Sequence, residues 1–287
     1  MKILVLGVTG MLGSSVFKLL STDSKYDVVG TARGSKVAEK LAQSVHSEII
    51  TGIDVLNHDD LISLFERVRP SVVINCIGLV KQLSSSSDPA IALPINSILP
   101  HRLAKLCSLA GAKLVHISTD CVFSGRKGSY VEEDISDAED LYGKSKFIGE
   151  IGGDRNVVTL RTSIIGHELA SSRSLVDWFL SQEVSVKGFA KAVFSGLPTV
   201  ELARVIRDYV IPDRNLFGLF HVAAQPISKL DLLVLIAGRY RKSIDIIPAD
   251  DFVIDRSLNA AKFKRATGYD APEWPDLIEL MHSSRLR

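Results

Sequence analysis

The sequence predicts an α/β protein: a doubly wound parallel sheet of the Rossmann type, with a smaller C-terminal lobe. Short apolar runs alternate with helical spacings through the first half of the chain, as they do when crossover helices join parallel strands. The first apolar run leads directly into a glycine string, Gly7, Gly10 and Gly13. A glycine string in that position is typical of a nucleotide-binding turn between a strand and a helix.

The expected strands of the first half are short and apolar. The run at Val72–Cys76 is almost continuously apolar, as a strand buried on both faces of a parallel sheet should be. The full set of strands is Ile3–Leu6, Asp27–Thr31, Ile49–Ile53, Val72–Cys76, Lys113–Ser118 and Val157–Thr162.

Helical spacing separates these strands at Val16–Leu20, Asp59–Val68 and Ile95–Leu109, and Gly111 is a stop signal after the last of them. Further along the chain the alternation weakens, and helices are expected at Leu175–Leu180, Leu202–Val210 and Leu230–Arg239. We therefore expect an NADP-binding Rossmann domain over residues 1–165. Residues 166–287 should form mainly a smaller lobe that closes over the substrate, with some segments returning to the first domain.

Composition narrows the kind of partner. The 287 residues are 46% hydrophobic, which is enough for a sizeable core. Formal net charge is +1, from 34 basic and 33 acidic residues, without a basic block or an acidic tail. This balance favours neither nucleic acid nor an anionic membrane as partner, so we expect a small molecule.

The chain carries no sign of export or membrane insertion. Its first apolar run meets glycine too early for a signal peptide, and no apolar stretch approaches the roughly 18 residues of a membrane span. The three cysteines, Cys76, Cys107 and Cys121, share no metal-binding spacing and are too few for a disulfide framework. We expect a cytoplasmic protein without a metal site.

The glycine string predicts where a dinucleotide binds. Gly7 permits the tight turn, Gly10 lets the backbone approach the diphosphate, and Gly13 lets the helix pack on the strand. The alternative is a turn with chance glycines. The intervening residues that should share the cofactor contact are Thr9, Met11 and Leu12.

The second strand points to the form of the cofactor. It ends in Thr31-Ala32-Arg33, without an acidic residue to bind a ribose diol. Arg33, together with Lys36, could instead pair with a 2′-phosphate, which favours NADPH over NADH. The alternative is that Arg33 is a solvated surface charge.

Tyr142 and Lys146 are the candidate chemical groups. A separation of four puts both side chains on one face of a helix, so the lysine should favour the charged form of the phenol. Thr119 lies upstream at the end of an expected strand, where such sheets bind ligands. Ketone reduction needs a proton donor at the oxygen, and we assign that role to Tyr142, with Thr119 fixing the oxygen. An exposed helical pair is the alternative.

The motifs resemble, in their order, the extended short-chain dehydrogenases/reductases, and within them the dTDP-4-dehydrorhamnose reductase family of sugar-nucleotide reductases. The resemblance spans nearly the whole chain. It rests on the glycine string, Asn75, Ser87-Asp-Pro-Ala-Ile-Ala with Asn96, His116-Ile-Ser-Thr-Asp-Cys-Val-Phe-Ser-Gly, Tyr142-Gly-Lys-Ser-Lys, Leu160-Arg-Thr, Leu197-Pro-Thr and Asp255-Arg-Ser-Leu-Asn.

This resemblance implies an oxidoreductase of dTDP-rhamnose and polysaccharide biosynthesis. The reaction would be NADPH-dependent reduction of the 4-keto group of a nucleotide-linked 4-keto-6-deoxy sugar, with hydride from the nicotinamide and the proton from Tyr142. A homodimer is the oligomeric state common among relatives. The implied cofactor contacts are Asp54 and Val55 at the adenine, Cys76, Ile77 and Gly78 along the groove, and Asn96, Tyr142 and Lys146 at the nicotinamide end.

The resemblance implies substrate contacts as well. These are Val80, Lys81, Asp120, Cys121, Thr162 and Ser163, with Phe194–Thr199 near the base and diphosphate. Lys187, Lys191 and Arg256 are candidate clamps for the diphosphate.

Cys121 departs from the family pattern and leaves alternatives open. Related 4,6-dehydratases place an acid there, and a thiol cannot take its place, which argues against dehydration. In enzymes of the GDP-fucose synthase type a cysteine at this offset is an acid/base in epimerisation, and His167 would be the second base here. Otherwise Cys121 is a small packed residue. A further alternative is a non-catalytic NADP-binding regulatory subunit, like that of methionine adenosyltransferase.

Overall fold

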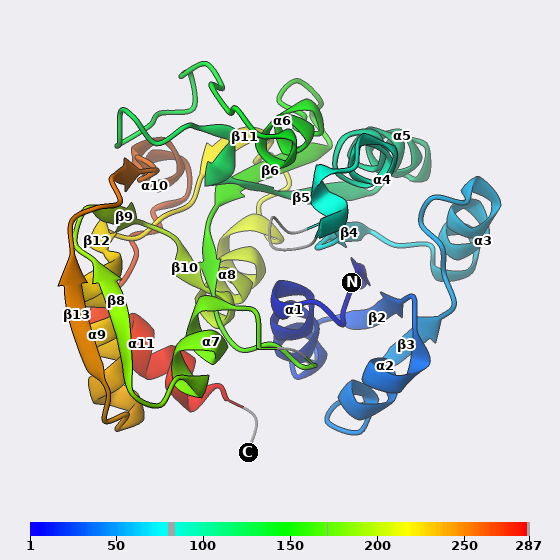
Figure 1. The fold of residues 1–287 in the computed structure, drawn as a ribbon. Coiled ribbons are helices and arrows are strands. Elements are labelled where there is room, and N and C mark those ends of the chain that lie inside the picture. Colours follow the sequence, from blue (N-terminus) through cyan, green and yellow to red (C-terminus); the bar gives the residue numbers. More distant parts are fainter. Residues whose placement is uncertain (80–83, 171, 286–287) are drawn as a thin grey trace.

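A parallel sheet forms the centre of the molecule (Figure 1). The computed structural model describes residues 1–79, 84–170 and 172–285. The strand order is β11-β6-β5-β4-β1-β2-β3, and neighbouring strands pair in parallel. The bounds are β1 (Lys2–Leu6), β2 (Asp27–Ala32), β3 (Glu48–Thr51), β4 (Val72–Asn75), β5 (Lys113–Thr119), β6 (Val157–Thr162) and β11 (Gly218–His221). This order confirms the doubly wound Rossmann fold.

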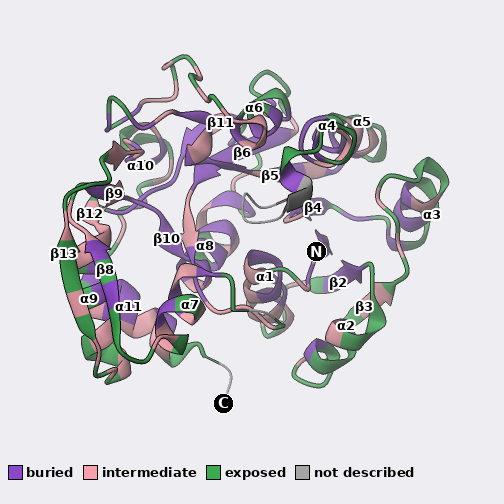
Figure 2. Cartoon of the chain, viewed as in Figure 1, coloured by how far each residue is buried: buried purple, intermediate pink, exposed green. Residues whose placement is uncertain are grey.

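Helices cover both faces of the sheet, and the strand residues divide between them. In β1, Ile3 and Val5 are buried against one hydrophobic layer, while Leu4 and Leu6 are buried against the other. The first layer includes α1 (Met11–Ser21), α2 (Ser35–Ala42) and α8 (Thr199–Val205). The second includes α3 (His58–Val68) and α5 (Leu99–Ala110). Burial on both faces explains the continuous apolar runs, and Figure 2 shows the sheet as its buried centre.

The helical run before β5 begins earlier than the sequence pattern predicts. The Asp88 side chain accepts from Ala90 N at 2.9 Å and caps a helix whose first residue is Pro89. From there α4 (Pro89–Ala92), the π-helical segment η2 (Leu93–Ile98) and α5 follow without a break. The expected helix at Ile95–Leu109 is therefore confirmed, but it is only part of the observed run.

The three helices predicted in the second half are confirmed. They are α7 (Leu175–Ser181), α9 (Lys229–Tyr240), and α8, which continues as the π-helical segment η4 (Ile206–Val210). Two segments from this half lie with the first-half elements, because α8 packs on α1 and β11 pairs with β6.

Short elements make up the remainder of the second half. The strands are β7 (Ile164–Ile165), β8 (Ser185–Phe189), β9 (Ala192–Phe194), β10 (Leu197–Pro198), β12 (Ile227–Ser228), β13 (Asp245–Ala249) and β14 (Ile254–Asp255). They form the small sheets β10-β7, β12-β9-β14 and β13-β8. Two helices, α10 (Ala261–Thr267) and α11 (Trp274–Ser283), complete the chain. The sequence analysis did not identify these elements. Strands of two or three residues have no readable periodicity, and the longer β8, β13, α10 and α11 lie where the alternation of apolar runs and helical spacings has weakened.

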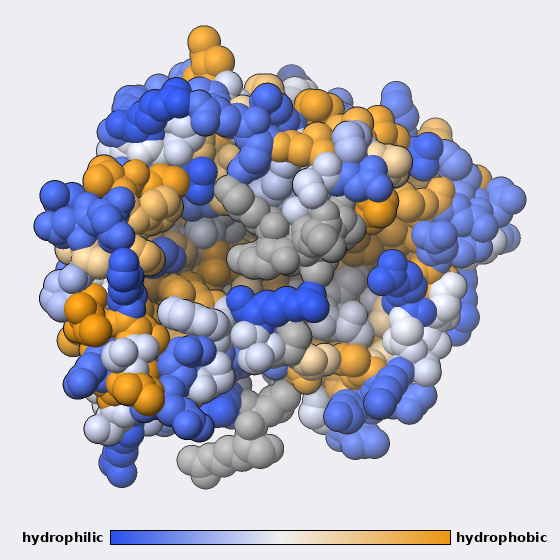
Figure 3. Space-filling view, viewed as in Figure 1, coloured by the Kyte–Doolittle hydropathy of each residue, from blue (hydrophilic) through white to orange (hydrophobic). Residues whose placement is uncertain are grey.

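The visible surface is mostly hydrophilic, with scattered apolar patches (Figure 3). Within the described ranges no helix has the length and apolar character needed to span a membrane.

Candidate active site

The turn after β5 and helix α6 (Leu141–Ile148) bring the three catalytic candidates together. The Asp140 side chain caps α6 by accepting from Gly143 N at 2.7 Å. A methyl group at Gly143 would lie 2.2 Å from the Cys121 carbonyl oxygen, so only glycine lets the helix pack this closely on the turn. The result is that the Thr119 hydroxyl, at the end of β5, lies near enough to the Tyr142 phenol to lower its pKa.

The Tyr142 phenol differs in its acidity from the sequence-based expectation. Burial raises its pKa above the ordinary value, and the nearby Cys121 and Asp120 raise it further, while only the Thr119 hydrogen bond lowers it. The Lys146 ammonium donates to the Ile117 carbonyl at 2.7 Å. Tyr142 therefore keeps its proton at neutral pH and is suited to donate it.

The Lys146 side chain is buried. Burial lowers its pKa to about 8, and the nearby Glu150 and Cys76 oppose that shift. A methyl group at Gly78 would lie 3.8 Å from Lys146 Nζ and 3.6 Å from Asn96 Oδ1. Gly78, Asn96 and Lys146 thus meet at one place, as the predicted cofactor contacts require.

Asn96, which belongs to η2, hydrogen-bonds to two neighbouring segments of the chain. Its Oδ1 accepts from Leu79 N at 2.9 Å, and its Nδ2 donates to Ser145 Oγ at 3.1 Å. A methyl group at Gly149 would lie 2.0 Å from the Asn96 carbonyl oxygen, so η2 and α6 are in close backbone contact. Asn96 therefore fixes both the segment after β4 and the helix that carries Lys146.

A buried ion pair supports the catalytic strand and helix, and the sequence analysis missed it. Arg161 of β6 donates to both carboxylate oxygens of Glu150, at 2.8 and 2.6 Å, and both side chains are buried. Ser118 Oγ, next to Thr119, donates to the same carboxylate at 2.6 Å. The sequence held one signal that could have revealed this ion pair, namely that Glu150 follows Lys146 by four residues.

The glycine turn has the geometry that the sequence predicts. Gly7 has φ of +82°, a conformation that favours glycine. A methyl group at Gly13 would lie 2.1 Å from the Gly7 carbonyl oxygen, so α1 can pack only with glycine there. Gly10 is exposed and precedes α1 as its N-cap residue. A cradle of this kind leaves backbone N–H groups free to approach an anion.

The remaining predicted cofactor residues follow the ends of neighbouring strands. Arg33 and Lys36 are exposed after β2, whose residue Thr31 pairs with Leu6 before the glycine turn. After β4, buried Asn75 accepts from Ile77 N at 3.1 Å and shapes the Cys76–Gly78 segment. After β3 the chain continues to the predicted adenine contacts, Asp54 and Val55.

The predicted substrate residues divide into three groups. Thr162 of β6 pairs in register with Thr119, and the Ser163 carbonyl accepts from Leu197 N at 2.9 Å. Asp120 and Cys121 lie in the turn beside Tyr142, where burial raises the pKa of the Asp120 carboxyl. Val80 and Lys81 lie outside the described residues.

Cys121 is poorly suited to act as a base. Burial, reinforced by Asp120, raises the pKa of its thiol to about 12, although Arg256 opposes the shift. A thiol with so high a pKa is almost fully protonated at neutral pH. This supports the interpretation of Cys121 as a small packed residue over its role in epimerisation.

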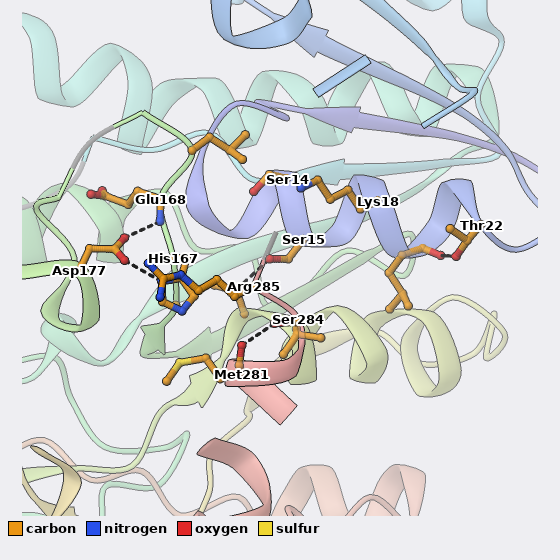
Figure 4. A pocket seen from close by; sticks show the side chains of 15 residues that line it. Ser14, Ser15, Lys18, Thr22, His167, Glu168, Asp177, Met281, Ser284 and Arg285 are labelled. Atoms are coloured by element: carbon orange, nitrogen blue, oxygen red, sulfur yellow. Dashed lines mark hydrogen bonds and ion pairs between the residues drawn. The ribbon is translucent and has the colours of Figure 1, made fainter. Parts of the chain in front are cut away.

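His167, the proposed second base, is bound elsewhere. Its Nδ1 lies 2.6 Å from Asp177 Oδ1, and its Nε2 lies 2.8 Å from the Tyr240 hydroxyl. It lines a cavity of about 510 Å³ along α1, and Figure 4 shows it there among Ser14, Ser15 and Lys18. None of the cavity's described lining residues belongs to the turn after β5. These contacts occupy both ring nitrogens of His167, which argues against its role as a second base.

Together the strand order, the glycine turn and the Thr119–Tyr142–Lys146 group define a Rossmann-type protein with a reductase-like site. The comparison with known families is more specific. Residues 1–281 match the RmlD substrate binding domain family, and the chain belongs to that family.

Individual relatives agree with this assignment. A dTDP-4-dehydrorhamnose reductase of Aggregatibacter actinomycetemcomitans is 24% identical over 95% of both chains. The methionine adenosyltransferase 2 subunit beta of Rattus norvegicus is 32% identical, over 52% of this chain and 41% of its own length.

Solved structures share the fold over nearly the full length. The dTDP-4-dehydrorhamnose reductase of Bacillus anthracis in complex with NADP has a TM-score of 0.81 at 20% identity, covering 99% of this chain and 98% of its own. The corresponding structure from Clostridium acetobutylicum has a TM-score of 0.78 at 25% identity and covers 99% of both chains.

Proposed function

We propose that this protein is an NADPH-dependent oxidoreductase that reduces the 4-keto group of a nucleotide-linked 4-keto-6-deoxy sugar. The observation that carries the proposal is the meeting of Thr119, Tyr142 and Lys146 beside the glycine turn of a Rossmann sheet. The names of the relatives support the substrate class: the full-length relative from A. actinomycetemcomitans is a dTDP-4-dehydrorhamnose reductase. The small-molecule partner would thus be a nucleotide sugar of the dTDP-rhamnose pathway.

The residues present fit a dinucleotide cofactor. Side chains are absent at Gly7, Gly10 and Gly13, where a diphosphate would approach the backbone. Because Gly78 has no β-carbon, it leaves space beside Lys146 and Asn96. The ribose of the nicotinamide would lie in that space. Arg33 would contact a 2′-phosphate, which favours NADPH over NADH. When bound, the cofactor supplies a hydride to the carbonyl carbon.

The chain's own residues supply the proton. As negative charge develops on the carbonyl oxygen, a neutral phenol at Tyr142 donates to it, and the raised pKa of Tyr142 keeps that proton available. The Thr119 hydroxyl would hold the same oxygen in place. Lys146, as a buried cation, would bind the ribose and stabilise the phenolate left on Tyr142.

A second candidate is a non-catalytic, NADP-binding regulatory subunit. The observation in its favour is the 32% identity to methionine adenosyltransferase 2 subunit beta. That similarity covers only 52% of the present chain. A pure binding protein also has no need to hold a threonine, a tyrosine and a lysine in catalytic geometry, so we favour the reductase.

The test is to incubate the protein with NADPH and a panel of nucleotide 4-keto-6-deoxy sugars while following nicotinamide absorbance. We expect oxidation of NADPH with at least one sugar. Binding of NADPH without turnover on any sugar would favour the regulatory role. Exchange of deuterium at carbons beside the ketone would restore the epimerase alternative for Cys121.

A further inference from the structure

A row of three polar side chains crosses the buried centre of the main sheet. His116 lies in β5, and its neighbours in register are Asn75 of β4 and Thr159 of β6. The exposed fraction of each is 0%. The residues two positions earlier in the three strands belong to the second hydrophobic layer, so the row lies on that face of the sheet. Polar residues are unexpected where a parallel sheet is buried on both faces.

The two outer residues of the row hold backbone segments. Asn75 Oδ1 accepts from Ile77 N at 3.1 Å. Thr159 Oγ1 donates to the Ile151 carbonyl at 2.8 Å. The central residue differs, because its Nδ1 lies 3.2 Å from Asn75 Nδ2, and this is the one hydrogen bond of the His116 side chain within the part of the chain that the structure describes.

The contacts of Asn75 decide which nitrogen of His116 carries the proton. The Asn75 carbonyl oxygen accepts from Ile77 N, so the amide nitrogen faces the imidazole. An amide nitrogen only donates, so His116 Nδ1 accepts and the proton lies on Nε2. Burial lowers the pKa of His116 well below its ordinary value, and Lys146 and His101 lower it further, so the ring is neutral.

The segment after β4, which Asn75 holds, touches both ends of the predicted cofactor site. A methyl group at Gly7 would lie 2.8 Å from Ile77 Cγ1, so this segment packs on the glycine turn. At its other end, a methyl group at Gly78 would lie 3.8 Å from Lys146 Nζ. A displacement of Ile77 would therefore disturb the surroundings of both the diphosphate and the nicotinamide ribose.

Packing alone does not account for a histidine at this position. His116 Nε2 is fully enclosed and has no partner among the described residues. An enclosed donor without an acceptor lowers stability, so an apolar side chain of similar size would suit the packing at least as well. What the imidazole adds is its contact with Asn75.

We infer that His116 is a positioning residue of the cofactor site: its Nδ1 fixes the amide of Asn75, which in turn holds Ile77 N. With the amide turned over, Asn75 would present a second donor to Ile77 N, and that hydrogen bond would be lost. Because His116 is fully buried, it acts through Asn75 and not by touching a ligand. The inference rests on the proposed function, since it adds a residue to the cofactor site of the proposed reductase.

Fluorescence titration of the full-length protein with NADPH tests this inference without requiring turnover. His116→Leu removes the acceptor at similar size, whereas His116→Asn offers an amide oxygen close to the position of Nδ1. Leu114→Ala is the matched control, because Leu114 is buried in the same strand and contributes to the same layer. Urea unfolding of each variant measures stability alongside affinity.

We expect His116→Leu to bind NADPH about tenfold more weakly, since Asn75 loses the acceptor that sets its orientation. His116→Asn should recover most of the affinity. The urea midpoint of His116→Leu should change little, because one enclosed N–H without a partner replaces another. Leu114→Ala should lower the midpoint and leave NADPH affinity unchanged.

A double-mutant cycle shows whether His116 acts through Asn75. Asn75→Ala should weaken NADPH binding, and adding His116→Leu should weaken it no further. Nitrogen NMR of histidine-labelled protein gives an independent readout. The His116 signals, assigned by their loss in His116→Asn, should show an unprotonated Nδ1 at neutral pH.

Any of four results would overturn the inference: unchanged NADPH affinity in His116→Leu, an equal loss in His116→Asn or Leu114→Ala, a full further loss in the double variant, or a protonated Nδ1. A wild-type protein that binds no NADPH would overturn it as well. Failure to reduce any nucleotide sugar, with NADPH binding intact, would count against the proposed reductase activity alone.

Discussion

At the residue scale, the burial of Lys146 makes the free energy of folding depend on pH. Folding lowers its pKa from the ordinary 10.5 to about 8, so the unfolded chain binds this proton more tightly than the folded protein. Between these two values the unfolded state holds more protons. Lys146 alone therefore makes folding more favourable as pH rises through that window.

Cofactor binding should depend on pH in the opposite sense. In the proposed site the ammonium form of Lys146 would bind the ribose, and this form is lost as pH rises through about 8. We expect NADPH affinity, measured by fluorescence titration, to fall across this range in the wild type. Lys146→Met should bind more weakly and show no such fall. An equally steep fall in Lys146→Met would assign the titration to another group.

Arg33 should decide between the two nicotinamide cofactors. It is exposed directly after β2, and the adjoining segment offers no acidic side chain for a ribose diol. Arg33→Ala should weaken NADPH about tenfold or more, through the loss of a charged hydrogen bond to the 2′-phosphate, and leave NADH nearly unchanged. Equal effects on the two cofactors would refute this assignment. Lys40→Ala, at an exposed lysine in the last turn of α2, is a control for the loss of charge.

At the element scale, the Glu150–Arg161 ion pair joins α6, β5 and β6. Removing the carboxylate in Glu150→Ala leaves a buried guanidinium without its partner, which should lower the free energy of unfolding by about 3–5 kcal/mol. The double variant Glu150→Leu with Arg161→Met should lose less than the two single variants together. Urea unfolding measures all of these, and strictly additive losses would mean that the two side chains are not coupled.

Six of the seven strands of the main sheet could be predicted from sequence, because most of them are buried and read as apolar runs, whereas β11 was not identified. The helices α3, α7 and α9 could be predicted because their apolar residues recur at helical spacing. The strands β9, β12 and β14 could not, since each has only two or three residues and is fixed by its neighbours. Those strands carry Phe194 and directly precede Lys229 and Arg256 in the chain.

Distances along the sequence also limited the site prediction. Thr119, Tyr142 and Lys146 belong to local motifs, so their positions could be read from spacing. The acidity of Tyr142 could not, because it depends on burial and on the direction in which Lys146 points. The same limit applies to His167, because its partners, Asp177 and Tyr240, are set by the packing of α7 and α9.

At the scale of the whole molecule, we propose a homodimer that forms through η2, α5 and α6. Three large apolar side chains, Ile98, Phe147 and Ile148, are exposed there, and Figure 3 shows apolar patches over α5 and α6. The elements adjoin, because His101 contacts the Ile148 carbonyl at 2.7 Å. Apolar groups that gather on a surface mark interaction sites.

Light scattering after gel filtration tests the dimer. The wild type should have about twice the 31.3 kDa mass of one chain, and Phe147→Glu with Ile148→Glu should be monomeric. Ile135→Glu, at another exposed apolar position, is the matched control and should remain dimeric. A monomeric wild type would refute the proposed interface.

The central claim is hydride transfer to a nucleotide-linked ketone with a proton from Tyr142. The most direct measurement uses NADPH deuterated at the transferred position of the nicotinamide and a nucleotide 4-keto-6-deoxy sugar, with mass spectrometry of the product. The wild type should place the label on the sugar. Tyr142→Phe should bind NADPH normally but react about 100-fold or more slowly. An unlabelled sugar with the wild type, or equal rates for both proteins, would contradict the account.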